Sequence, residues 1–145
     1  MGLLDRFRKK AEEKQVEEVK KTTTNLEEFC GKDKRVYEAL HKIMFLDPRK
    51  IKVSMNEAEE KAKFFEKQKE VQEARMWYDV AGGLAIYEGD VEKVKKYFGK
   101  SAKLSPESHY PILKIPEKAV QKAGEYYRKI FKEEDIRKMV TEEKA

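Results

Sequence analysis

Apolar residues recur at intervals of three or four along nearly the whole chain, and no segment sustains an alternation of apolar and polar residues. The clearest stripe consists of Val71, Ala74, Tyr78, Ala81 and Ala85. Because an α-helix has about 3.6 residues per turn, steps of three and four place these side chains on one face of a helix. The sequence therefore predicts an all-α fold without a sheet.

Caps and breakers divide this pattern into separate helices. The predicted helical segments are residues 2–20, a short piece ending at Gly31, residues 33–46, the stretch from Ser54 to Tyr87, and residues 90–103, 116–131 and 133–140. Ser54 and Glu57 have the spacing of a capping box, and Pro116 falls in a first turn, where proline is well tolerated. The predicted organisation is an amphipathic basic helix at 1–24, a helical-hairpin domain at 25–140 and a frayed tail at 141–145.

The composition sets the class of protein. Charged residues make up 42% of the chain and apolar residues 39%, and no apolar run approaches the length of a membrane span. One cysteine, Cys30, excludes an internal disulfide, and no secretory signal precedes the first charged residues. These features predict a cytoplasmic protein, and its many charges and few amides are typical of heat-adapted proteins.

Two stretches of the chain share a pattern that runs from a glycine to a proline. One begins at Gly31 and the other at Gly89, and the matching pairs are Val36/Val94, Lys42/Lys100, Leu46/Leu104 and Pro48/Pro106. Glycine readily adopts the left-handed conformation that ends a helix, and Asp-Pro or Ser-Pro can start the next one. Each copy is therefore predicted to be a helical hairpin, with Gly31 and Gly89 at positive φ.

The second copy resembles the tetratricopeptide repeat over residues 75–108. The matching positions are Tyr78, Ala81, Gly82, Gly89, Asp90, Val94, Phe98 and Pro106, although Ala85 replaces an aromatic and Ala81 is smaller than the usual leucine. The first copy, at 15–48, matches only in its second half, at Gly31, Val36, Leu40 and Pro48. Residues 49–68 are interpreted as an insertion between the copies, because repeats of this family are spaced more closely.

The resemblance implies antiparallel helical hairpins, stacked as a right-handed superhelix or closed into a compact bundle. In this family the first helices line a groove for a peptide or another protein. The groove positions here would be Arg75, Asp79, Gly83 and Ile86, and the Lys and Asn of a carboxylate clamp are missing. The alternative is that this face is covered by the 116–131 helix or by the amino-terminal helix.

Motifs for catalysis and metal binding are weak. The triplet Gly99-Lys100-Ser101 lies inside a helical pattern and lacks the leading glycine of a phosphate-binding loop. Glu38 and His41 have the Glu-x-x-His spacing of bundle di-iron sites, but such a site needs a second copy of the motif. We therefore expect no catalytic, cofactor or metal site, and predict a non-enzymatic protein-interaction module or scaffold.

Two basic features support an alternative function. The amino terminus combines apolar Leu3, Leu4 and Phe7 with basic Arg8, Lys9 and Lys10, as in helices that lie on anionic membranes. The same apolar side chains would also suit docking on the rest of the chain or on a second copy in a homo-oligomer.

A second basic feature lies within the 90–103 helix. Lys93, Lys96, Lys100 and Lys103 step by three, four and three and form a lysine stripe along one side. Such a stripe can contact phosphates of a nucleic acid or a membrane surface. The net charge of only +5 and the dispersed acidic residues favour a solvated helix face instead. The alternative function is therefore a basic helical protein that binds nucleic acid or, peripherally, an anionic membrane.

Overall fold

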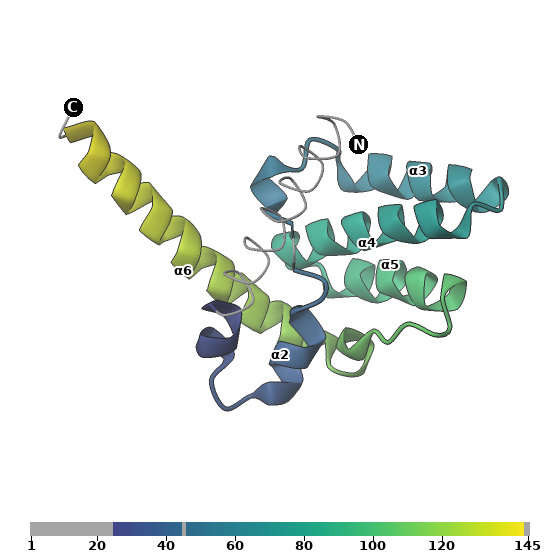
Figure 1. Ribbon diagram of the computed structural model, residues 1–145, viewed down its shortest axis with the longest axis horizontal. Coiled ribbons are helices and arrows are strands. Elements are labelled where there is room, and N and C mark those ends of the chain that lie inside the picture. Colours follow the sequence, from purple (N-terminus) through teal and green to yellow (C-terminus); the bar gives the residue numbers. More distant parts are fainter. Residues whose placement is uncertain (1–24, 45, 144–145) are drawn as a thin grey trace, which may run out of the picture.

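The computed structural model describes residues 25–44 and 46–143, and these residues form helices, turns and loops without a strand (Figure 1). The prediction of an all-α fold is confirmed for them. After helical residues 25–30, the elements are α2 (Lys34–Leu40), η1 (Pro48–Lys50), α3 (Met55–Lys67), α4 (Val71–Glu88), α5 (Val91–Leu104), η2 (Pro111–Lys114) and α6 (Pro116–Glu143). The predicted helix at 1–24 lies outside the described residues.

Helices α3, α4 and α5 form one antiparallel layer with α4 in the middle (Figure 1). The stretch from Ser54 to Tyr87, predicted as nearly uninterrupted helix, contains two helices. Lys69 adopts a φ of 60° between them, and the Glu70 amide donates to the carbonyl of Phe65 at 3.0 Å. Such a left-handed residue closes a helix, and here it is not the glycine that usually marks the position. The predicted insertion at 49–68 therefore contributes α3 to the core.

Both predicted glycine turns are present. Gly31 has a φ of 57° between helical residues 25–30 and α2, and Gly89 has a φ of 76° between α4 and α5. Asp33 and Asp90 follow these glycines and cap the next helix, accepting from the amides of Val36 and Lys93 at 3.3 and 3.1 Å. The prediction of positive φ at both glycines is confirmed.

The conformation of Gly89 gives a stability prediction. A valine there would keep a β-branched side chain in the left-handed region, although no atom lies within 4 Å of the added Cβ. We expect Gly89→Val to lower the free energy of unfolding by about 1–2 kcal/mol. Chemical denaturation measures this change, and Gly99→Val, at another open helical glycine, is the control. Equal losses in the two variants would contradict a role for the turn.

The Gly31 hairpin packs on α6 and η2. Helix α6 also contacts α4 and α5, so it lies between this hairpin and the three-helix layer (Figure 1). Helix α2 ends at Leu40, earlier than the predicted boundary at residue 46. The chain then turns at His41, whose Nδ1 lies 3.2 Å from the carbonyl oxygen of Tyr37.

Helix α6 is longer than predicted. It replaces the two expected helices at 116–131 and 133–140, because no glycine or proline follows Gly124. The Thr141 hydroxyl donates to the carbonyl of Arg137 at 2.9 Å, and residues 141–143 of the predicted frayed tail are helical. Its carboxyl-terminal half extends beyond the other helices (Figure 1). The Arg49 guanidinium fastens the middle of α6 to η1 by stacking 3.6 Å above the Phe131 ring and pairing with Glu134.

Candidate functional site

The predicted partner face of α4 is only partly open. Ile86 is fully buried in the core, so it is not available to a partner and its predicted contact is wrong. Arg75 and Asp79 have side chains that are 38% and 19% exposed. Gly83 is half-buried, and a Cβ added there would have no neighbour within 4 Å. The open part of the face is therefore the stretch around Asp79 and Gly83.

Tyr110, immediately before η2, covers the amino-terminal part of this face. Its hydroxyl donates to Asp79 Oδ2 at 3.2 Å and receives a hydrogen bond from Arg75 Nε at 2.9 Å. Arg75 Nη1 also donates to the Ser105 hydroxyl at 3.2 Å. Among the described residues, the segment before η2 covers this part of the face in place of the suggested 116–131 helix, and the amino-terminal helix, the other suggestion, lies outside the described residues.

Asp79 keeps one carboxylate oxygen without a partner. Oδ1 is buried and makes no hydrogen bond within the described part of the chain. The neighbouring Ser101 hydroxyl makes a long contact of 3.5 Å to the carbonyl oxygen of Arg75, and it also interacts with the Asp79 carboxylate. Burial raises the pKa of Asp79, while the nearby Ser101 and Tyr110 hydroxyls and the Arg75 charge oppose that rise. A buried acceptor without a donor costs stability, so a donor brought by a ligand would be favourable here.

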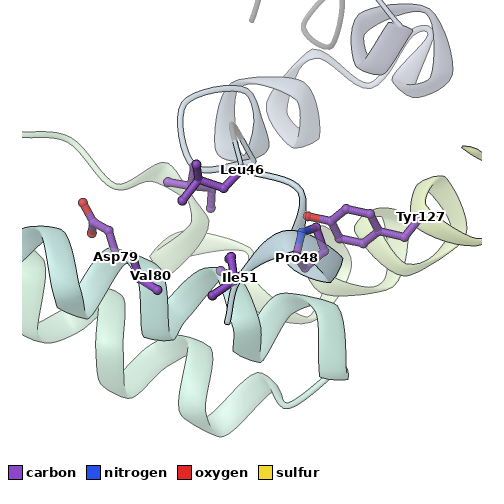
Figure 2. A pocket seen from close by; sticks show the side chains of 8 residues that line it. Leu46, Pro48, Ile51, Asp79, Val80 and Tyr127 are labelled. Carbon is purple, nitrogen blue, oxygen red and sulfur yellow. The ribbon is translucent and has the colours of Figure 1, made fainter. Parts of the chain in front are cut away.

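A shallow pocket opens beside Asp79 and Gly83. Figure 2 shows Asp79 at one end and Tyr127 of α6 at the other, with Leu46, Pro48 and Ile51 facing α4 between them. The complete lining is Ile43, Leu46, Pro48, Ile51, Asp79, Val80, Gly83 and Tyr127. Its volume of about 290 Å³ includes the open mouth. The enclosed space is only about 10 Å³, room for about one water molecule, so the pocket is a shallow surface depression against which a partner side chain could lie.

The sequence did not indicate the wall opposite α4. Ile43 was expected on the inner face of a helix, and Ile51 lay in an irregular stretch without periodicity. Leu46 is 45% exposed at the pocket, a large apolar side chain left in the open. The only sequence signal for this wall was an apolar composition in the turn, with Ile43, Leu46, Pro48 and Ile51 between two helices. Nothing in that composition indicated which helix the turn would pack against.

The structure divides the lysine stripe of α5. Lys96 Nζ lies 2.9 Å from Glu59 Oε1 of α3, and Lys93 is half-buried. Lys100 and Lys103 are exposed, and no ion pair is described for either within residues 25–44 and 46–143. Part of the stripe therefore joins α3 to α5, and the remainder faces solvent.

Glu59 is the acceptor at the centre of this α3–α5 junction. It accepts from the Tyr97 hydroxyl at 2.6 Å and also pairs with Lys63 at 3.0 Å. These partners and Lys96 lower the pKa of Glu59 to about 2. The junction is therefore an ionised structural contact between two helices.

Other reactive groups of the described residues lie apart from the pocket. Cys30 is buried, and burial raises the pKa of its thiol. The ring of His41 stacks on Tyr37 with centroids 5.0 Å apart. Within the described ranges, no group of three or more His, Cys, Asp or Glu side chains is arranged to hold a metal ion, and no helix could cross a bilayer.

The predicted membrane-contact residues Leu3, Leu4, Phe7, Arg8, Lys9 and Lys10 lie outside the described residues. Comparison of the chain with protein-family models, with curated proteins and with solved structures found no match.

Proposed function

We propose that this chain is a non-enzymatic protein-interaction module of the cytoplasm that binds a partner polypeptide at the pocket between α4 and residues 43–51. The observation that carries the proposal is Asp79, which lines one end of a largely apolar pocket and whose buried Oδ1 makes no hydrogen bond within residues 25–44 and 46–143. Buried carboxylate oxygens are normally satisfied by donors, and here the donor would come from the partner.

The chemistry of the pocket selects a basic side chain. Ile51 and Val80 offer aliphatic contact to a methylene stem, and Asp79 offers an acceptor to the ammonium or guanidinium at its tip. Gly83 has no side chain, so the partner's backbone can approach α4 closely at this position. The occupant would be one lysine or arginine of an extended or helical partner segment.

The resemblance to the tetratricopeptide repeat agrees with this location. In that family the first helix of each hairpin lines the groove, and α4 is the first helix of the hairpin at 75–108. Gly82 and Phe98, two of the matching positions, are in contact in this hairpin, because a Cβ added at Gly82 would lie 2.6 Å from the Phe98 ring. We therefore describe α4 and α5 as a tetratricopeptide-like pair that presents one side-chain pocket.

Selection from a phage-displayed library of random peptides tests the proposal on the full chain. Enriched peptides should share a lysine or arginine, and their affinity should fall by about tenfold or more in Gly83→Leu, because the new side chain fills the pocket. Gly99→Leu is the matched control, since Gly99 is also a helical glycine with no atom within 4 Å of an added Cβ. Equal losses in both variants would place the binding site elsewhere.

A separate variant tests whether the charge of Asp79 selects a basic residue. Asp79→Asn keeps an acceptor for Tyr110 but removes the charge, so selected peptides should lose their preference for a basic residue. An unchanged preference would contradict the assignment of Asp79. If the selection yields no binder, and anionic vesicles or duplex DNA bind in a manner abolished by Lys100→Glu and Lys103→Glu, the alternative function at the lysine stripe replaces the proposal.

A further inference from the structure

The pocket lies on a line of α4 that continues in both directions along the helix. Met76, Val80, Gly83 and Tyr87 follow one another at steps of four, three and four, so they lie on one face. Val80 and Gly83 line the pocket. Met76 and Tyr87 are therefore the neighbours of the pocket along α4.

Helix α6 closes this line at its carboxyl-terminal end. The Tyr87 ring lies 5.5 Å from the Tyr127 ring and 6.0 Å from the Phe131 ring, both in α6. Tyr127 also forms the end of the pocket that is remote from Asp79 (Figure 2). A segment bound at the pocket therefore cannot continue along α4 in this direction without displacing α6.

The line stays open at its amino-terminal end. Met76 is 50% exposed, and Gln72, one turn earlier, is exposed as well. Arg75 is held by Tyr110 on one side of this line, and Trp77 is partly buried on the other. Methionine has a flexible, polarisable side chain that adapts to apolar partners at binding surfaces. An apolar contact is thus available one turn from the pocket.

The backbone of α4 limits the kind of segment that can lie on this line. Its amides and carbonyls are paired within the helix, so α4 offers no backbone partners to an extended peptide, as a sheet edge would. An extended segment would lose water from its own amides and carbonyls without gaining partners from α4. A helical segment satisfies these groups internally, so a helix is the favoured occupant.

The spacing of the two contacts gives a motif. Met76 lies four residues before Val80, a rise of about 6 Å along α4. On a second helix that packs nearly antiparallel or parallel to α4, the same rise separates residues that are four positions apart. We infer that the partner segment is an amphipathic helix, with a lysine or arginine at the pocket and an apolar residue, four positions away, on Met76. This inference rests on the proposed function of the pocket.

Peptides selected on the full chain test the motif. Alanine scanning of a selected peptide should find two sensitive positions, one basic and one apolar, at a spacing of three or four. Replacing either residue should weaken binding about tenfold. A basic and an apolar residue at a spacing of two would indicate an extended segment and would overturn the inference.

Met76→Glu gives a sharper test. The variant should bind the peptides selected on the wild-type chain about tenfold more weakly, because a carboxylate then faces their apolar residue. A new selection on the variant should replace that apolar residue with a second basic one, a change that a loss of folding could not produce. Met139→Glu on α6 is the matched control. Met139 is also an exposed helical methionine, at 62%, and its variant should keep the wild-type affinity and motif.

The outcomes separate this inference from the proposed function. If Gly83→Leu weakens the peptides and Met76→Glu does not, the pocket remains the binding site and the helical partner is wrong. If neither variant weakens them more than its control, or no peptide is selected, both proposals are wrong. A wild-type chain that is a dimer by light scattering, and a monomer as Met76→Glu, would show that a second copy occupies this face and would also overturn the inference.

Discussion

Replacing Phe98 with alanine is expected to lower the free energy of unfolding by about 3–5 kcal/mol. Phe98 is fully buried, packs directly over the backbone of Gly82 in α4, and its ring lies 5.8 Å from that of Tyr110. Removing the ring would open a cavity between α4 and α5. Urea denaturation followed by circular dichroism measures the loss, and a loss below about 1 kcal/mol would contradict this packing.

A double-mutant cycle with Gly82 makes the same prediction more specific. A Cβ added at Gly82 would lie 2.6 Å from the Phe98 ring, so Gly82→Ala should destabilise the wild-type chain by about 1–3 kcal/mol. In the Phe98→Ala background the obstacle is gone, and alanine's higher helix propensity should make the same change neutral or stabilising. Strict additivity of the two changes would show that Gly82 and Phe98 are not in contact.

The hairpin core was predictable because its signals are local. Gly31 and Gly89 mark left-handed turns, and the spacing of Tyr78, Val94 and Phe98 indicates which faces meet. Tyr78, Gly82, Val94 and Phe98 are all buried, and Leu104 is partly buried beside them. A glycine turn and a helical period act within a few residues, so they can be read without knowing the rest of the fold.

The turn at Lys69 and the burial of Ile86 were not predictable in the same way. Lys69 has a positive φ, a conformation that glycine or asparagine usually marks in a sequence and lysine does not. The boundary between α3 and α4 could therefore not be predicted from the sequence. Ile86 lies in a helix that contacts α3, α5, α6 and η1, and such a helix is buried on more than one side. Periodicity indicates one apolar face, whereas the number of neighbours is decided by tertiary packing.

The candidate site was half predictable for a related reason. Asp79 and Gly83 were identified from the face of α4, but Leu46 and Ile51 reach the pocket from a turn with no helical register. The direction of such a turn depends on contacts made elsewhere, such as the stacking of Arg49 on Phe131. A pocket between a helix and a turn therefore becomes visible only in the folded chain.

The contacts of Glu59 between α3 and α5 predict that the free energy of unfolding depends on pH. The pKa of Glu59 is about 2 in the folded chain and near 4.3 in an unfolded chain, so ionised Glu59 stabilises the fold. This contribution, with an upper bound of about 3 kcal/mol, is complete above the unfolded pKa and is lost as the pH falls through the folded pKa. Glu59→Gln should therefore lower the free energy of unfolding by about 2–3 kcal/mol at neutral pH.

The difference between wild type and Glu59→Gln should shrink as the pH falls below about 4.3 and nearly vanish close to pH 2. Urea denaturation at neutral and acidic pH measures it. Glu60→Gln is the control, because Glu60 is exposed on the same helix and no ion pair is described for it within the described ranges. It should have little effect at any pH. A Glu59→Gln deficit that is constant with pH would mean that Tyr97 and the two lysines do not act through the carboxylate charge, and that the α3–α5 contact depends on packing alone.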